Sequence, residues 1–156
     1  MITDTNTEQT DKIKSLLDTY PYLIRNEGNG SLVTAAKNIR IELARAFPGV
    51  KFRVRSRRYW MGNYINVGWT DGPTKKQVEE IIDKYEAGSF DGMTDLYTYE
   101  STAWTDAFGE AKYISANRSY TNAAVATVIE RLKLEYGNTQ APTVEDYNQG
   151  LAWNTT

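Results

Sequence analysis

Two residue types that carry much of protein chemistry are missing from this chain. Neither cysteine nor histidine occurs in its 156 residues. Without cysteine there is no disulfide, no thiol nucleophile and no cysteine-type zinc site. Without histidine the chain lacks the commonest metal ligand and the side chain that titrates near neutral pH. These absences exclude many classes of hydrolase and redox enzyme, and they favour a non-enzymatic protein that requires no cofactor and no metal.

Long apolar runs are also missing. No segment approaches the roughly 20 apolar residues that a membrane-spanning helix needs. The first nine residues are polar and lack the basic and apolar regions of a signal peptide. We therefore expect a soluble protein of the cytoplasm with no membrane contact, and the absence of cysteine agrees with a reducing compartment.

Length and composition indicate an ordinary globular protein. The length suits a single domain over residues 1–156, and 40% hydrophobic with 24% charged residues is typical of a folded chain. We expect residues 1–10 to be a frayed end and residues 138–156 to be a tail with one short helix. The net charge of −2 argues against a uniformly basic nucleic-acid binder and against a uniformly acidic DNA mimic.

The spacing of apolar residues predicts a fold of the α+β class. Apolar residues recur at helical spacing near residues 10–20, 31–47, 74–88 and 121–137. Residues 50–56 and 64–70 alternate between apolar and polar, which is typical of two half-exposed strands joined as a β-hairpin. The side chains expected on its core side are Phe52, Val54, Ile65, Val67 and Trp69. We therefore expect a small antiparallel sheet built on this central hairpin, with helices packed on one face.

Residues 89–110 show no sustained period. They are rich in aspartate, threonine, glycine and aromatics, so we expect a long structured loop with one short strand near residues 97–99. Loops of this length inside a domain are often functional. The aromatic side chains of Tyr97, Tyr99, Trp104 and Phe108 indicate a small satellite core under the loop rather than a ligand-binding pocket. A further strand is predicted over residues 111–116.

Charge is strongly segregated along the chain. Residues 31–82 hold ten Lys and Arg against four acids, a balance of +6, whereas residues 83–110 hold one Lys against seven acids, a balance of −6. Asymmetry of this kind suggests a binding partner. The two segments supply the two candidate binding surfaces.

The first candidate surface is the basic hairpin, which consists of Lys51, Arg53, Arg55, Arg57, Arg58, Tyr59, Trp60 and Tyr64. On a strand, Lys51, Arg53, Arg55 and Arg57 would point the same way, about 6.5–7 Å apart. This row could follow the phosphates of DNA or RNA while the nearby aromatics stack on bases. It could also contact an acidic protein surface, or be a solvated sheet face paired in part with the acidic segment.

The second candidate surface is the acidic loop, which contains Asp91, Asp95, Glu100 and Asp106. Carboxylates such as these can bind a divalent metal or act as a catalytic pair. The segment from Asp91 to Asp95 lacks the alternating oxygen ligands of an EF-hand loop, so we favour a structural or partner-facing loop. Such a loop could occupy a basic nucleic-acid channel.

Four stretches occur together in a familiar order. They are residues 36–52 (AKNIRIELARAFPGVKF), 65–74 (INVGWTDGPT), 88–95 (GSFDGMTD) and 111–114 (AKYI). Because the four stretches occur in this order, roughly residues 35–120 resemble one of the large polyvalent protein-associated domains. These domains occur in phages and conjugative elements. The resemblance implies a protein that travels with a mobile element and acts in the cytoplasm of a bacterial host. It brings no agreed catalytic residues with it.

The resemblance also suggests a role. A small protein of this kind looks like a counter-defence protein, of the anti-CRISPR or antirestriction type, that inhibits a host defence protein or nucleoprotein complex by binding it through the charged surfaces. The alternative is a nucleic-acid-binding accessory protein that coats or escorts the DNA of the element. An enzyme that uses carboxylates or tyrosine on a nucleotide-like substrate is the third interpretation and the least favoured.

Overall fold

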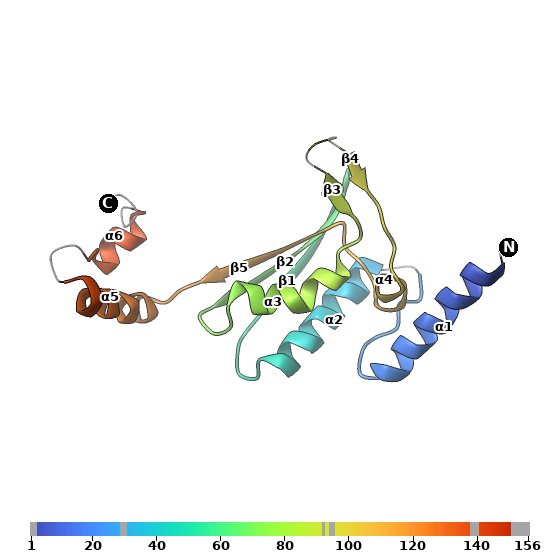
Figure 1. The fold of residues 1–156 in the computed structure, drawn as a ribbon, viewed down its shortest axis with the longest axis horizontal. Coiled ribbons are helices and arrows are strands. Elements are labelled where there is room, and N and C mark those ends of the chain that lie inside the picture. Colours follow the sequence, from blue (N-terminus) through green and yellow to red (C-terminus); the bar gives the residue numbers. More distant parts are fainter. Residues whose placement is uncertain (1–2, 29–30, 92, 94–95, 138–140, 151–156) are drawn as a thin grey trace. The chain divides into compact units, whose positions relative to one another are not determined.

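The computed structural model describes residues 3–28, 31–91, 93, 96–137 and 141–150, and it divides into two compact units, Met1–Asn117 and Arg118–Thr156. The elements in chain order are α1 (Thr3–Thr19), α2 (Ser31–Ala46), β1 (Arg53–Tyr59), β2 (Gly62–Thr70), α3 (Lys75–Ile82), the 3-10 helix η1 (Asp83–Tyr85), β3 (Ser89–Asp91), β4 (Leu96–Thr98), α4 (Ala103–Phe108), β5 (Tyr113–Ser119), α5 (Asn122–Tyr136) and α6 (Val144–Asn148) (Figure 1). The division into one domain over 1–156 stays a prediction.

The helices overlap the segments that the spacing of apolar residues predicts, but some of their first and last residues differ from the prediction. Helix α1 begins at Thr3 rather than near Thr10, so the segment expected to be frayed is helical from Thr3 onward. Helix α3 begins with the capping box that Thr74 and Gln77 predict: the Thr74 hydroxyl accepts from the Gln77 N–H at 3.3 Å, and the Gln77 side chain accepts from the Thr74 N–H at 2.9 Å. The α-helical part then ends at Ile82 and continues as η1.

The predicted hairpin is confirmed. Strands β1 and β2 pair antiparallel, with Val54 opposite Val67 and Arg55 opposite Asn66. The predicted core-side residues Val54, Ile65, Val67 and Trp69 are buried, and Phe52 is half-buried against them. The turn lies at Trp60 and Met61, because Gly62 already pairs with Tyr59.

Strand β5 completes a three-stranded sheet in the order β1-β2-β5. The Lys112 N–H donates to Asn63 Oδ1 at 2.8 Å, and Asn66 Nδ2 donates to Ser115 Oγ at 2.9 Å. Both pairs are separated by 49 residues in the sequence. Because the offset is constant, β5 runs parallel to β2, and the chain reaches it through α3, β3, β4 and α4. The sheet is therefore small and mostly antiparallel, as predicted, with one parallel edge strand.

The segment from 89 to 110 contains more regular structure than a loop. Strand β3 pairs antiparallel with β4, and α4 follows. The prediction of one short strand is correct for β4, but β3 and α4 were not predicted. Helix α4 has only six residues, which is less than two turns and too short for a helical period to be recognised. Its capping box, Thr102 and Thr105, was the available signal.

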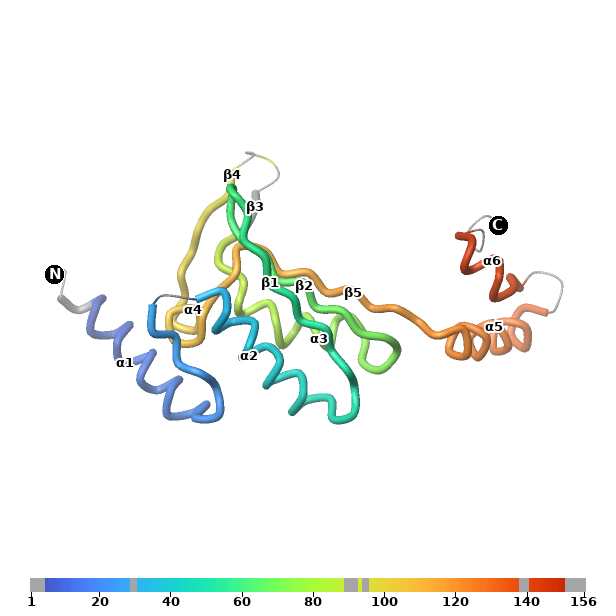
Figure 2. The backbone as a smooth tube through the Cα atoms, turned by 180° about the vertical axis from the view of Figure 1, so that it is seen from behind, coloured from blue at the N-terminus to red at the C-terminus, as the bar shows by residue number. Residues whose placement is uncertain are grey.

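Within the first unit, helices α2 and α3 cover one face of the sheet, and the side chains on its other face are exposed or half-buried. Helices α2 and α3 lie on the same side of the strands in the two opposite views (Figures 1 and 2). The core between them is formed by buried residues of α2, the strands, α3, η1 and α4, among them Ile39, Leu43, Val54, Ile65, Val67, Val78, Ile82, Tyr85 and Phe108. The fold is thus of the predicted α+β class, with a hydrophobic layer under one sheet face only.

A buried amide and a glycine hold α4 against α2. Asn38 is fully buried, and its side chain donates to Ile24 O at 2.8 Å and to Phe108 O at 2.9 Å while it accepts from the Ile24 N–H at 2.7 Å. Gly109 has φ +93°, and a Cβ at this position would lie 2.3 Å from the Ser31 carbonyl oxygen. Only glycine allows the backbones to approach so closely.

The second unit consists of the end of β5 and two helices. The Thr121 hydroxyl caps α5 by accepting from the Ala124 N–H at 3.2 Å, and α5 ends at Gly137 as predicted. Helix α6 is the short helix expected in the tail, and Asn148 Nδ2 donates to Asn122 Oδ1 at 3.2 Å to join it to α5. Over the part of the chain that the structure describes, no helix is both long and apolar enough to cross a membrane.

Candidate functional site

The uncovered side of the three-stranded sheet, which we call the open face, is the leading candidate site. The strand register and the two-residue period of strands decide which side chains lie on it. They are Arg53, Arg55, Arg57 and Tyr59 from β1, Tyr64 and Asn66 from β2, and Tyr113, Ser115 and Asn117 from β5. The open face therefore combines cationic, aromatic, amide and hydroxyl groups.

The arginines of β1 form an exposed row. Arg53, Arg55 and Arg57 are all exposed and occupy alternate positions, as predicted. Within the described residues, no ion pair or hydrogen bond engages these three side chains. The expectation that the acidic segment partly neutralises the row therefore finds no support in the described residues. A row of unpaired like charges remains available for an anionic partner.

Other residues of the basic hairpin lie elsewhere. Lys51 is exposed but precedes β1. Arg58 pairs with Asn63 and lies on the opposite side from the row, where it is exposed beyond the edge of the core. Trp60 is 92% exposed at the turn. The strand register places Arg53, Arg55, Arg57, Tyr59 and Tyr64 on the open face and Arg58 on the opposite side, and it does not extend to Lys51.

Three tyrosines line an open hollow beside the arginine row. The hollow has a volume of about 450 Å³ and is lined by Tyr59, Tyr64, Tyr113, Ile114 and Ser115. The ring centroids of Tyr59 and Tyr64 are 6.2 Å apart. Its volume lies within the range of small-molecule sites, about 300–1,000 Å³.

A lysine adds positive charge at the edge of this hollow. The Lys112 ammonium lies 4.5 Å from the centroid of the Tyr97 ring and 5.4 Å from that of Tyr113. Lys112 Nζ also donates to Met61 O at 3.1 Å. The two rings pack edge-on with their centroids 5.6 Å apart. These contacts fix the position of Tyr113, which is 37% exposed.

Of the four acidic-loop residues, the structure describes the side chains of Glu100 and Asp106. Asp106 lies in α4 and accepts from Gln9 Nε2 at 2.8 Å and from the Ser101 hydroxyl, so it serves internal contacts. Glu100 is exposed, the backbone of Asp91 lies in β3, and the side chain of Asp91 and all of Asp95 fall outside the described residues. Among the described residues, no group of three or more carboxylates is placed to hold a metal ion.

Two further acids of this region also make internal contacts. The Tyr99 hydroxyl donates to Glu110, and this hydrogen bond raises the pKa of Tyr99 to about 12. Glu86 accepts from the Ile114 N–H at 3.0 Å, and burial raises the pKa of its carboxyl despite that hydrogen bond. The Glu86 contact attaches the acidic segment to β5, and the Tyr99 contact lies within that segment, so both indicate a structural role.

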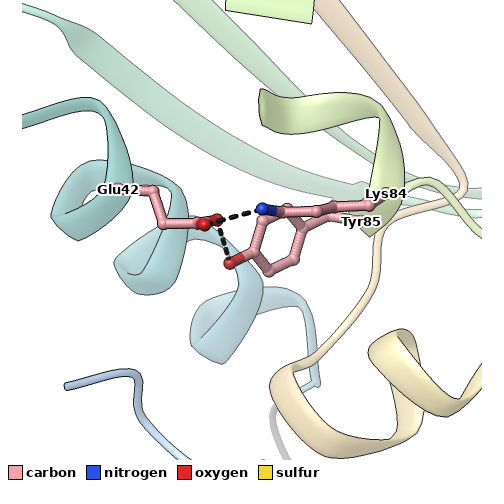
Figure 3. Close-up of polar contacts among 3 residues, drawn as sticks. All are labelled: Glu42, Lys84 and Tyr85. Atoms are coloured by element: carbon pink, nitrogen blue, oxygen red, sulfur yellow. Dashed lines mark hydrogen bonds and ion pairs between the residues drawn. The ribbon is translucent and has the colours of Figure 1, made fainter. Parts of the chain in front are cut away.

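A buried polar cluster joins α2 to η1 (Figure 3). Glu42, only 8% exposed, accepts from Lys84 Nζ at 2.6 Å and from the Tyr85 hydroxyl at 2.6 Å. Burial and the contact with Glu42 raise the pKa of Tyr85 far above its usual value, so the phenol stays protonated as a hydrogen-bond donor. Lys84 Nζ lies 4.2 Å from the centroid of the Trp104 ring. The Glu42 carboxylate, the Lys84 ammonium and the Tyr85 hydroxyl each have a hydrogen-bond partner within the cluster, which is typical of a structural contact.

The four aromatic residues predicted to form a satellite core do not lie together in the part of the 89–110 segment that the structure describes. Trp104 and Phe108 join the main core, where their ring centroids are 4.7 Å apart. Tyr97 packs against Tyr113, and Tyr99 is 59% exposed. The prediction of a satellite core is therefore wrong. Trp104 and Phe108 lie four residues apart in α4, so both lie on the face of this helix that packs toward α1 and η1.

Sequence reasoning missed the contribution of β5 to the open face. Tyr113, Ser115 and Asn117 alternate with Ile114 and Ala116, and this two-residue period was the available signal. The period does not show which strand β5 pairs with, or whether that pairing is parallel or antiparallel. That choice brings Tyr113 beside Tyr64 and creates the hollow.

Comparison with known proteins places the chain in a family. No curated protein and no solved structure matches it significantly. The sequence model of the family described as Large polyvalent protein associated domain 29 matches residues 31–121. This stretch covers more than half of the chain and runs from the first residue of α2 to the cap of α5. It includes every residue of the open face, and the expected resemblance is confirmed. The chain belongs to the large polyvalent protein associated domain 29 family and is a protein associated with phages or other mobile elements.

Proposed function

We propose that this protein is a non-enzymatic binding protein of a mobile element and that its open face binds nucleic acid. The observation that carries the proposal is the row of Arg53, Arg55 and Arg57, which is exposed, unpaired among the described residues, and flanked by tyrosines. Phosphates supply the matching row of negative charges, and arginine is well suited to contact them. The alternation of strand residues spaces the guanidinium groups by about 6.5–7 Å, near the distance of two phosphates along one strand.

The non-enzymatic part of the proposal rests on chemistry. The chain holds no histidine and no cysteine, which removes the usual acid–base group and thiol nucleophile. The buried cluster of Glu42, Lys84 and Tyr85 is satisfied internally and stabilises the contact between α2 and η1. Binding through an exposed surface needs none of these groups.

The biological role that we propose for this binding is counter-defence. A family of mobile-element proteins supplies the context, and a host defence nucleoprotein complex of the CRISPR or restriction type offers nucleic acid as a target for the open face. The alternative role, coating or escorting the DNA of the element, uses the same surface. Affinity capture from a host lysate with and without nuclease separates the two. Capture of a defence complex supports counter-defence, and capture of bulk DNA alone supports the escort role.

The experiment for the binding activity is a salt titration with a labelled oligonucleotide. We expect the logarithm of the affinity to fall against the logarithm of the salt concentration with a slope of about 2–3, from three arginine–phosphate contacts at about 0.7–0.9 each. The double variant Arg55→Glu/Arg57→Glu should bind weakly and lose most of this slope.

The matched control is Lys75→Glu/Lys76→Glu on α3. It changes the net charge by the same amount on exposed residues outside the open face, so it should retain the slope and most of the affinity. Circular dichroism should show both variants folded. If the wild type binds no oligonucleotide at about 0.1 M salt but captures a host protein after nuclease treatment, the partner is an acidic protein surface and the proposal is wrong.

A further inference from the structure

We infer that the open face binds a single strand, with an unpaired base stacked in the hollow lined by Tyr59, Tyr64 and Tyr113. This inference rests on the proposed function and specifies its ligand. The feature that carries it is the position of the tyrosines: Tyr64 and Tyr113 come from the strands beside the arginine row, and Tyr59 follows Arg57 at the end of the row. A strand whose phosphates follow β1 therefore has its bases over β2 and β5.

The hollow suits the flat face of a base. Tyr59 is 42% exposed and Tyr113 is 37% exposed, so part of each ring is accessible to a ligand. Tyrosine is a common stacking platform because its ring faces are apolar and its hydroxyl remains hydrated. The hollow of about 450 Å³ is open along one side, so a base can enter while the sugar and phosphate stay outside.

Charge at the hollow is also complementary to a nucleotide. The Lys112 ammonium lies 5.4 Å from the centroid of the Tyr113 ring, which lines the hollow. Asn66 and Ser115 bond to each other at 2.9 Å next to the tyrosines, and their remaining donor and acceptor positions can pair with base edges. Phosphate, ring and base edge thus each meet a matching group within three adjacent strands.

A duplex does not fit this arrangement. In a duplex the ring faces are stacked on neighbouring base pairs and cannot reach a tyrosine without being unstacked. Three strands at about 4.8 Å spacing make a narrow, open surface that runs along a single backbone. The open face accordingly resembles a stacking platform more than a groove for a helix, and single-stranded DNA and RNA share the required chemistry.

The first test compares ligands on the unmodified protein. Anisotropy is measured with a labelled DNA strand of about 10 nucleotides, with the RNA strand of the same sequence, and with the DNA duplex of that sequence. We expect at least one single strand to bind about tenfold or more tightly than the duplex. The DNA and RNA arms decide which strand is preferred.

The second test removes the rings. Each of Tyr64→Ala and Tyr113→Ala should weaken single-strand binding about 5- to 150-fold, the usual effect of losing one stacking ring. The salt slope should stay unchanged, because the arginine contacts remain. Tyr64→Phe and Tyr113→Phe keep the ring and should bind nearly as the wild type does. Tyr136→Ala, which removes an exposed tyrosine of α5, is the matched control and should have no effect.

The outcomes separate the inference from the proposed function. If the duplex binds as well as either strand and the tyrosine-to-alanine variants bind normally, the open face binds nucleic acid through phosphates alone and the inference is wrong. If no oligonucleotide binds at about 0.1 M salt, the proposed function and the inference both fail. If alanine and phenylalanine weaken binding equally, the hydroxyl groups rather than the rings carry the contact and stacking is refuted.

Discussion

The two faces of the three-stranded sheet are built from the same strands and have opposite character. Val54 and Val67 face each other on the covered side, and Arg55 and Asn66, the next residues along, face each other on the open side. The buried positions of the covered side, Val54, Ile65, Val67 and Trp69, are apolar, whereas the open side keeps arginine, tyrosine and amide groups in solvent. One shift of register would exchange the two sets. The contrast shows that burial fixes the strands, and that the open side is free to serve binding.

The most direct test of this difference between the two faces is to place the same charge on each of them. Val67→Asp puts a carboxylate at a fully buried position with no partner, so we expect the loss of a cooperative unfolding transition, a cost above about 4 kcal/mol. Asn66→Asp, one residue away and opposite Arg55, should change the free energy of unfolding by less than about 1 kcal/mol. Thermal unfolding followed by circular dichroism measures both. A well-folded Val67→Asp variant would refute the register.

The next largest effect concerns the helices that cover the buried side. In Gly109→Ala the new Cβ would lie 2.3 Å from the Ser31 carbonyl oxygen and 2.7 Å from the Ala35 nitrogen, at φ +93°. We expect a loss of more than about 3 kcal/mol, because α4 must move away from α2. Gly49→Ala is the matched control: its φ is +85° and nothing lies within 4 Å, so only the backbone cost of about 1–2 kcal/mol applies. Equal losses in urea unfolding would show that α4 and α2 do not meet as described.

A smaller effect is expected for substitutions in the polar cluster of Glu42, Lys84 and Tyr85. Glu42→Ala leaves the Tyr85 hydroxyl buried without an acceptor, and we expect a loss of about 1–3 kcal/mol in urea unfolding. Glu42→Gln keeps an acceptor for Tyr85 and loses only the ion pair with Lys84, so it should cost less. If Tyr85→Phe abolishes the difference between the two Glu42 variants, the hydroxyl is the group that matters. If the difference persists unchanged, this account of the cluster is wrong.

The smallest expected effect is on the pH dependence of stability. Burial raises the pKa of Glu86, so the folded state binds that proton more tightly than the unfolded state does. The free energy of unfolding therefore falls as pH rises from the ordinary pKa near 4.5 through the raised value. Glu86→Gln cannot titrate, so its stability relative to the wild type should increase over this window. Unfolding midpoints measured between acid and neutral pH would contradict the assignment if wild type and variant changed in parallel.

The parts of the fold that follow from short-range pattern were predictable. The period of two in β1 and β2, the apolar stripe of α2, and the capping pair Thr74 and Gln77 each lie within a few residues of one another. Helix α4 and strand β3 are too short to show a period. Asn38 occupies a core position of a helix, and only the tertiary fold reveals that Ile24 and Phe108 supply its partners.

The same limit applies to the candidate site. The arginine row lies on one strand, and alternation alone places Arg53, Arg55 and Arg57 on one side. The hollow depends on Tyr113, which reaches Tyr64 only because β5 pairs with β2 in parallel, an interaction between distant parts of the chain. The acidic loop stays a prediction as a binding surface, because the side chain of Asp91 and all of Asp95 lie outside the described residues. Proximity in the sequence did not bring Glu100 and Asp106 into a common site, because α4 directs Asp106 toward Gln9.

The parallel position of β5 has a consequence for the order of folding. The hairpin of β1 and β2 closes through a two-residue turn, and hairpins form within about 1–10 μs. Strand β5 joins β2 only after the intervening residues, α3 and α4 included, have closed a loop of 49 residues, and contacts of long sequence separation form more slowly. A chain still emerging from the ribosome therefore displays its arginines before Tyr113 exists beside them. The tyrosine hollow is therefore completed only after the arginine row has formed.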